Sequence, residues 1–277
     1  MSGERPFRFG VVVGRPASGG EWSRTARDVE ALGYSALLLP DTTYTPSPFP
    51  ALAAAAAVTT TLHVGSWVLA APFRSPAAVV RETSALQLLS GGRFELGIGT
   101  GRPDAAREAE LLGEVWGSAA DRIARLVDVV AAVREHVSPA PPVVVAGAGP
   151  RVLAAPHGAE TVALALPPTA TLDDVARGAD LARSAGRDPE LALQLSGVGG
   201  RLVAHLARQG LTPADLRDAA AVLPGDANAM TEALLRLRTR TGISYLTVAA
   251  EHAEFFAPVA RDLADRRDEG AGGVSSP

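Results

Sequence analysis

The stretch "RFELGIGTGRP", residues 93–103, begins with apolar residues at alternate positions and then runs into glycine, threonine, arginine and proline. The alternation has the period of two that is typical of a β-strand. Three glycines, at 97, 99 and 101, leave the backbone without side chains where this strand ends. Glycine at such a point lets a flat or anionic ligand approach the backbone, and it also suits a tight turn with positive φ. The stretch alone leaves both interpretations open.

Seven further apolar runs of strand length lie on either side of this stretch. They cover residues 7–13, 35–39, 62–69, 142–147, 161–166, 191–195 and 243–248. Near-continuous apolar strands separated by helical segments are typical of buried parallel strands. Eight strand–helix units of this kind predict the α/β class and, within it, a (β/α)8 TIM barrel.

Capping signals mark the helices between these runs. Ser75 before Pro76 begins a helix that Gly91 ends, and Ser118 with Asp121 has the spacing of a capping box. Apolar stripes predict further helices at residues 22–32 and 227–241. These signals support helices that cover the outside of a sheet or barrel.

The chain carries no obvious linker, so we expect one domain over residues 1–267. Residues 196–225 are expected to add helical material between the seventh strand and its main helix. The last ten residues, "DEGAGGVSSP" at 268–277, have the composition of a disordered tail.

Composition excludes several functions. The 277 residues are 47% hydrophobic, enough for a large core, and the net charge of −4 argues against a nucleic-acid partner. All 26 basic residues are arginine, which excludes a lysine Schiff base and a Walker A phosphate site. The chain has no cysteine, and its five histidines are not spaced as metal ligands, so we expect no metal site. His136 and His157 are expected in last helical turns.

The N-terminal residues reach a strand-like run without an apolar signal core, and no apolar stretch reaches 18 residues. Together with the absence of cysteine, this predicts a cytoplasmic protein with no membrane partner.

Residues 74–113, "RSPAAVVRETSALQLLSGGRFELGIGTGRPDAAREAELLG", resemble the signature of the bacterial luciferase-like superfamily, in its branch of coenzyme F420-dependent oxidoreductases. The segments "FRFGVVV", "LHVGSWVLAAPFRSP" and "VVVAGAGPRVLAA" also resemble units of that family. The resemblance implies a luciferase-like barrel that forms a homodimer. It implies hydride transfer between a deazaflavin, coenzyme F420, and a small organic substrate. An FMN-dependent monooxygenase of the same superfamily and a cofactor-free enzyme or binding protein remain alternatives.

The resemblance also implies catalytic residues. Relatives carry an Asp-His pair at the end of the second strand, whereas this chain has Asp41 followed by Thr42. A neutral hydroxyl does not accept a proton as an imidazole does near pH 7, which argues against alcohol oxidation with that base. Arg74 is the arginine that relatives retain after the third strand. Residue chemistry alone leaves two alternatives open, a turn or helix-capping role for Asp41 and an ion pair between Arg74 and Glu95.

The cofactor contacts implied by the resemblance fall on three strand ends. The third strand is expected to contain a cis peptide at Trp67–Val68 that supports the deazaflavin ring, while Ala71 replaces a polar amide found in relatives. The full set of implied cofactor contacts is Trp67, Val68, Leu69, Gly99, Thr100, Gly101, Gly147, Ala148 and Gly149. The last three precede a helix, where unpaired amides bind phosphate. The glycine-rich residues 196–201 are a second candidate for a phosphate cradle.

Overall fold

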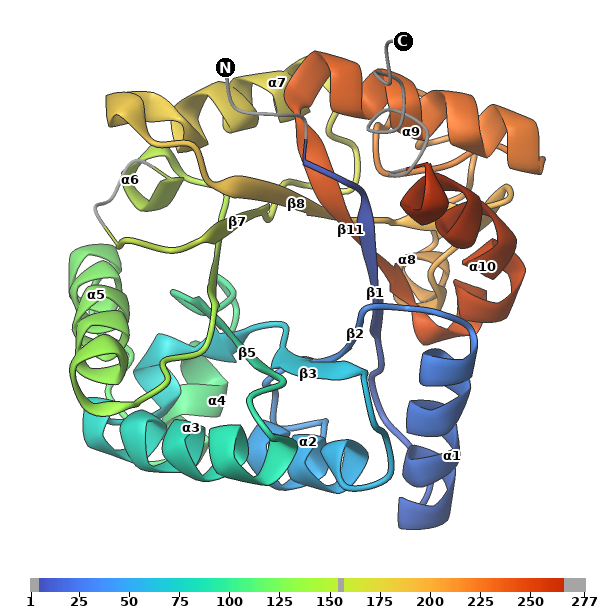
Figure 1. Cartoon of the computed structure of the whole chain (residues 1–277). Helices are drawn as coiled ribbons and strands as arrows, with labels where there is room; N and C mark the ends of the chain where they lie inside the picture. The colour runs from blue at the N-terminus through green and yellow to red at the C-terminus, as the bar shows by residue number, and fades with distance from the viewer. Residues whose placement is uncertain (1–4, 154–156, 267–277) are drawn as a thin grey trace, which may run out of the picture.

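The strands close into a parallel barrel that is ringed by helices (Figure 1). The computed structural model describes residues 5–153 and 157–266. The barrel strands are β1 (Arg8–Val12), β2 (Ala36–Leu39), β3 (His63–Ser66), β4 (Leu69–Ala70), β5 (Phe94–Gly99), β6 (Val143–Gly147), β7 (Thr161–Leu164), β8 (Glu190–Gln194) and β11 (Ile243–Ala249). β3 and β4 share the third place, because both pair with β5. The predicted (β/α)8 fold is confirmed.

Helices follow the strands around the outside of the barrel. Their bounds are α1 (Gly19–Ala31), α2 (Pro48–Ala56), α3 (Pro76–Ser90), α4 (Ala106–Leu111), α5 (Ala119–His136), α6 (Pro150–Leu153), α7 (Leu172–Ala182), α8 (Ala204–Arg208), α9 (Ala227–Thr241) and α10 (Ala250–Asp265). The Ser75 side chain caps α3, Gly91 ends it in the left-handed conformation, and Ser118 with Asp121 forms a capping box on α5. These predicted helix ends are confirmed. In the part of the chain that the structure describes, no helix is long and apolar enough to cross a membrane.

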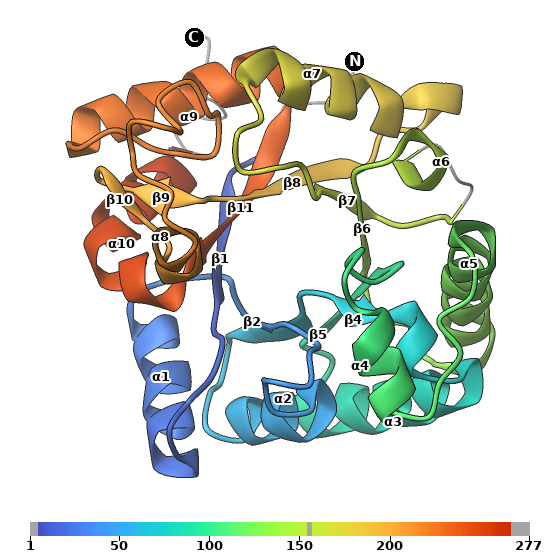
Figure 2. The ribbon, with the colours of Figure 1, turned by 180° about the vertical axis from the view of Figure 1, so that it is seen from behind.

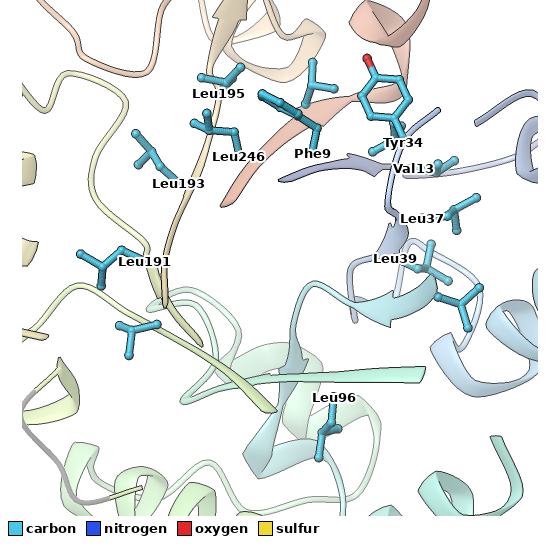
Figure 3. Packing of buried hydrophobic residues seen from close by; sticks show 14 of the residues in the cluster. Phe9, Val13, Tyr34, Leu37, Leu39, Leu96, Leu191, Leu193, Leu195 and Leu246 are labelled. Carbon is cyan, nitrogen blue, oxygen red and sulfur yellow. The ribbon is translucent and has the colours of Figure 1, made fainter. Parts of the chain in front are cut away.

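The core has two layers, one on each side of the strands. The outer layer lies between strands and helices, and Figure 3 shows side chains such as Phe9, Leu37 and Leu193 pointing from the strands away from the barrel interior. The inner layer is smaller and contains Leu38, Tyr245 and several alanines. Since successive strand residues face opposite sides, the leucine-rich strands supply the outer layer at every second position. The inner positions hold a mixture of alanines with a few large side chains.

The segment at 196–225 departs from the prediction. It begins with a hairpin of two short strands, β9 (Gly197–Val198) and β10 (Arg201–Leu202), and only α8 within it is helical. Gly199 and Gly200 both have positive φ, so the glycines form the turn of this hairpin. Figure 2 shows the barrel from the end at which this hairpin and α4 lie.

Two other predictions concern a pair of histidines and the C-terminal tail. His136 ends α5, as expected, but His157 does not lie in a helix: it is buried in the segment before β7. The predicted disordered tail at 268–277 lies outside the described residues.

Candidate active site

A cavity of about 560 Å³ opens at the carboxyl ends of the barrel strands. Its size falls within the roughly 300–1,000 Å³ of small-molecule sites. The structure brings together eleven of the twelve predicted site residues as lining of this one cavity: Asp41, Thr42, Trp67, Val68, Leu69, Gly99, Thr100, Gly101, Gly147, Ala148 and Gly149. The twelfth, Arg74, does not line the cavity but bonds to Asp41.

The third strand is interrupted where it reaches the cavity. β3 ends at Ser66, β4 begins at Leu69, and the Trp67–Val68 peptide between them is cis, as expected. The Ser66 hydroxyl donates to the Gly97 carbonyl (2.7 Å) and accepts from the Gly97 amide (3.0 Å). This serine side chain therefore provides hydrogen-bond partners for the amide and carbonyl of Gly97 in β5, at the point where β3 ends.

The glycines of β5 and its loop have packing reasons of their own. A Cβ at Gly97 would lie 1.9 Å from the Ser66 carbonyl oxygen. Gly101 has a φ of +82°, and a Cβ there would lie 2.5 Å from the Trp116 ring. At these two positions, protein atoms already fill the space of a side chain. Ligand approach is thus not needed to explain them, although Gly99 and Gly101 still line the cavity.

Asp41 is held in place by several bonds. Both of its carboxylate oxygens accept from the Arg74 guanidinium, one of them at 3.0 Å, and Oδ2 also accepts from the Ala70 amide at 3.2 Å. The interpretation of Asp41 as a helix cap is wrong, because the N-cap of α2 is Ser47. The Arg74–Glu95 pair is wrong as well. Asp41 and Arg74 instead tie the end of β2 to β4 and its following turn.

Thr42 serves the loop that contains it. Its hydroxyl accepts from the Tyr44 amide (3.1 Å) and meets the Thr45 hydroxyl at 3.2 Å. Tyr44, in the same loop, is 69% exposed and does not line the cavity. Thr42 therefore shapes this part of the rim.

Glu108 of α4 joins two loops of the rim and was missed by the sequence analysis. Its buried carboxylate accepts from the Thr43 amide (2.7 Å), the Thr43 hydroxyl (3.2 Å) and the Arg102 guanidinium. Thr43 follows β2 and Arg102 follows β5, so one carboxylate connects both sides of the cavity mouth. A single Glu in an amphipathic helix gives no sequence signal for this role.

Arg122, on the first turn of α5, is a cation on the cavity wall. Its guanidinium lies 4.4 Å from the centre of the Trp116 ring, and Nη1 donates to the Gly117 carbonyl at 3.0 Å. Its buried Nε has no hydrogen-bond partner, and within the described residues no carboxylate lies within ion-pair distance of it. Arg102, in contrast, is paired with Glu108 and Asp104. Arg122 is thus available to an anionic group of a ligand.

The floor of the cavity is made by a tryptophan and a glutamine. Trp67 Nε1 donates to Gln194 Oε1 at 2.9 Å, and the Trp67 ring meets the edge of the Tyr245 ring with centroids 5.7 Å apart. Trp67 and Gln194 both line the cavity, whereas Tyr245 lies fully buried beneath.

A charged cluster, which we call the barrel floor, fills the amino-terminal end of the barrel. It consists of Arg8, His63, Glu95, Glu190 and Tyr245. Arg8 donates to Glu95 (2.8 Å) and to Glu190 (2.8–3.0 Å), and its guanidinium lies 3.5 Å from the Tyr245 ring centre. His63 Nδ1 lies 3.3 Å from the Glu95 carboxylate. Burial raises the pKa of Glu95, but the neighbouring His63 and the charge of Arg8 lower it overall.

Of the two predicted phosphate sites, one lines the cavity and the other does not. Gly147, Ala148 and Gly149 line the cavity, and the described part of α6 begins directly after them at Pro150. Amides at the start of a helix can bind an anion. The second candidate, residues 196–201, is the β9–β10 hairpin and does not line the cavity. Its glycines serve the hairpin turn, and phosphate binding there stays a prediction.

Proton transfer has few candidates in the cavity. Of its described lining side chains, only Asp41, Arg102 and Arg122 are ionisable, and none is histidine, glutamate or tyrosine. Elsewhere in the described residues, no group of three His, Cys, Asp or Glu side chains is placed to hold a metal ion. The site therefore offers binding surface, hydrogen-bond donors and fixed charge rather than a free acid or base.

A parallel barrel with a broken third strand and a cavity at its carboxyl end defines a luciferase-like fold. The sequence model of the family described as luciferase-like monooxygenase matches residues 6–205, so the chain belongs to this family.

Among curated relatives, an uncharacterized protein of Mycobacterium bovis is 31% identical over 129 residues, which cover 38% of this chain and 44% of that protein. The F420-dependent glucose-6-phosphate dehydrogenase of Amycolatopsis mediterranei is 35% identical over 75 residues, or 27% of this chain and 22% of that enzyme. The chain thus matches less than half the length of these relatives.

Two solved structures represent both cofactor types. The coenzyme F420-dependent tetrahydromethanopterin reductase of Methanopyrus kandleri has a TM-score of 0.69 at 15% identity, covering 93% of this chain and 99% of that one. The oxygenating constituent of 3,6-diketocamphane monooxygenase from Pseudomonas putida, in complex with FMN, has a TM-score of 0.67 at 16% identity, covering 99% and 100%. At these identities the likeness concerns the fold.

Proposed function

We propose that this protein is an F420-dependent oxidoreductase that transfers hydride between a deazaflavin and a small organic substrate. The observation that carries the proposal is the cavity itself, in which the interrupted third strand faces the bare backbone of Gly99 to Gly101. Sequence identity with an F420-dependent dehydrogenase favours the deazaflavin.

The lining residues fit a flat ring with a polar tail. Val68, Leu69 and Ala70 give an apolar surface, while Thr100 offers a hydroxyl and Arg122 an unpaired cation. Amphipathic ligands of this kind bind where apolar walls carry a few placed polar groups. The residues therefore fit the cofactor that the family implies.

The same residues favour reduction of the substrate over oxidation of an alcohol. When bound, the reduced deazaflavin supplies the hydride. Alcohol oxidation needs a proton acceptor near the hydroxyl, and the carboxylate of Asp41 is already bonded to Arg74 and Ala70. In the reducing direction, the cavity residues would hold the substrate beside the ring, and water would supply the proton that accompanies the hydride. The protein's part is to orient the substrate.

An FMN-dependent monooxygenase is the second candidate. It is favoured by the description of the matching family and by the FMN-bound monooxygenase with the same fold. The two candidates differ in the ring that the cavity holds.

Titration of the purified protein with reduced and oxidised F420 and with FMN, followed by absorbance and fluorescence, tests the proposal. We expect micromolar binding of the deazaflavin and weaker binding of FMN. Tighter binding of FMN would replace the proposal with the second candidate. Binding of neither ring below millimolar concentration would favour a cofactor-free enzyme or a binding protein.

We also propose that the protein forms a homodimer. Leu88 and Leu89 on α3 are 82% and 64% exposed, and exposed leucines side by side are typical of association surfaces. Light scattering at micromolar concentration should give twice the chain mass of 28.4 kDa. A single-chain mass would refute this state.

A further inference from the structure

We propose that Gln194 is a specificity-determining residue: its amide nitrogen donates to a carbonyl oxygen on the ring edge of the bound ligand, and Trp67 fixes the amide in that orientation. The inference rests on the proposed function, since it assigns a ring contact within the same cavity. Neither residue is a charged group or a predicted catalytic residue.

The two side chains meet across the barrel. Trp67 belongs to the third barrel strand and Gln194 to the end of the seventh, so three strands separate them on either side. Their hydrogen bond, 2.9 Å from Nε1 to Oε1, spans the interior and closes the cavity floor. Tyr245 supports the Trp67 ring from below by an edge contact.

The chemistry of indole sets the orientation of the amide. The Trp67 N–H is a donor only, so it must face the amide oxygen of Gln194 and never the nitrogen. The nitrogen then lies on the opposite arm of the planar amide. It donates to no other described residue, and it is not among the buried polar atoms without a partner. Since Gln194 lines the cavity, its two N–H donors are open to a ligand.

This arrangement selects acceptors. A glutamine whose amide is free to flip can present either its oxygen or its nitrogen to a ligand, but an amide held by Trp67 presents N–H donors alone. A carbonyl oxygen at the ring edge is bound, whereas an N–H at the same place is left unpaired at a cost. The hydrogen-bonded pair of Trp67 and Gln194 thus determines which edge of a flat ring faces it.

The test compares three substitutions in the full chain, with FMN and F420 as probes. Gln194→Glu keeps an acceptor for Trp67 and, at pH 8, removes both donors. We expect ring affinity to fall about tenfold or more, because a carboxylate then faces a carbonyl. Gln194→Met removes the donors without adding charge and should cost about three- to tenfold. Trp67→Phe keeps an aromatic floor but frees the amide, and should cost about twofold, since half of the amide orientations remain productive.

A second readout is independent of the ligand. The difference in fluorescence between the wild type and Trp67→Phe isolates the Trp67 emission. That emission should shift in Gln194→Met, which leaves the indole N–H without its acceptor, and much less in Gln194→Glu. Gln209→Glu is the matched control, because Gln209 is exposed and outside the cavity. It should leave ring affinity and emission unchanged.

The outcomes separate the two proposals. If the wild type binds a ring and Gln194→Glu binds it with the same affinity, the role of Gln194 is overturned and the proposed function stands. A wild type that binds neither ring overturns both. Loss of affinity in Gln194→Glu with folding intact, as judged by circular dichroism, supports the assignment.

Discussion

The two ends of the barrel interior use polar residues in opposite ways. At the amino-terminal end, the barrel floor pairs Arg8 with both Glu95 and Glu190, so the charge of Arg8 is neutralised within the protein. At the carboxyl end, Asp41 and Arg74 neutralise each other, but among the described residues Arg122 has no carboxylate within ion-pair distance and the Gln194 amide nitrogen has no acceptor. Buried charges must be paired to be tolerated, whereas donors beside a cavity can also bond to a ligand or to water. The amino-terminal end therefore contributes to stability, and the carboxyl end is where we propose that a ligand binds.

Removing the cation of the barrel floor should give the largest effect. Arg8→Met leaves two carboxylates in the interior without their partner, and we expect a loss of about 3–5 kcal/mol in the free energy of unfolding. Urea denaturation measures it. Adding Glu95→Gln and Glu190→Gln to the same chain should restore part of the stability. A loss under about 1 kcal/mol would contradict the separation between the two ends.

Lowering the pH should reduce the free energy of unfolding without changing the affinity of the cavity for the ring. Burial and then the charge of Arg187 lower the pKa of His157 to about 4, from the ordinary value of 6.5. Since the folded state disfavours protonation, the unfolded state binds more protons between these values. Stability is therefore complete above pH 6.5 and falls as pH drops toward 4, by about 3 kcal/mol.

Denaturation at several pH values checks this expectation, with His157→Gln as the variant that should lose most of the dependence. Ring affinity should stay constant over the same interval, since no described lining residue is a histidine. A wild type whose unfolding free energy is flat from pH 7 to 4 would show that His157 is not held neutral.

A methyl group at Gly97 tests the junction between the two ends. Gly97→Ala places a Cβ against the Ser66 carbonyl oxygen, and overpacking of this kind costs about 1–3 kcal/mol. Gly14→Ala is the matched control, because no atom lies within 4 Å of a Cβ there. Melting temperatures compare the two. Equal stability would mean that the third strand yields to the added group.

Arg122→Met should weaken binding of the ligand's phosphate tail and leave binding of its ring unchanged. Loss of a charge-assisted bond is expected to weaken FMN by about tenfold and to leave riboflavin, which lacks the phosphate, unaffected. Fluorescence titration of both compounds measures the difference. Arg236→Met, at an exposed position outside the cavity, serves as control. Equal losses for FMN and riboflavin would place the effect on the ring instead.

The smallest effect is expected for Thr100→Val at the rim. Removal of one neutral hydrogen bond should reduce cofactor affinity by about 0.5–1.5 kcal/mol, or three- to tenfold, with little change in stability. Calorimetric titration together with thermal melting tests both parts. A destabilised variant with unchanged affinity would assign Thr100 to the packing of its loop.

Local sequence patterns were sufficient for the barrel and for the rim at which its cavity opens. Alternation in β5, near-continuous apolar strands and capping residues such as Ser75 and Ser118 each act over a few neighbouring positions, so they can be recognised in one dimension. Because strand ends in a parallel barrel share one rim, the ends of β2, β3 and β5 could also be placed together.

The partners of side chains were decided by tertiary structure alone. Arg74 pairs with Asp41 and not with Glu95, Glu108 joins two loops, and Trp67 reaches Gln194 across the barrel. These contacts link residues 33, 65 and 127 positions apart. No periodicity relates such pairs. Barrel closure sets which strands oppose each other, and it therefore decides which distant side chains can meet.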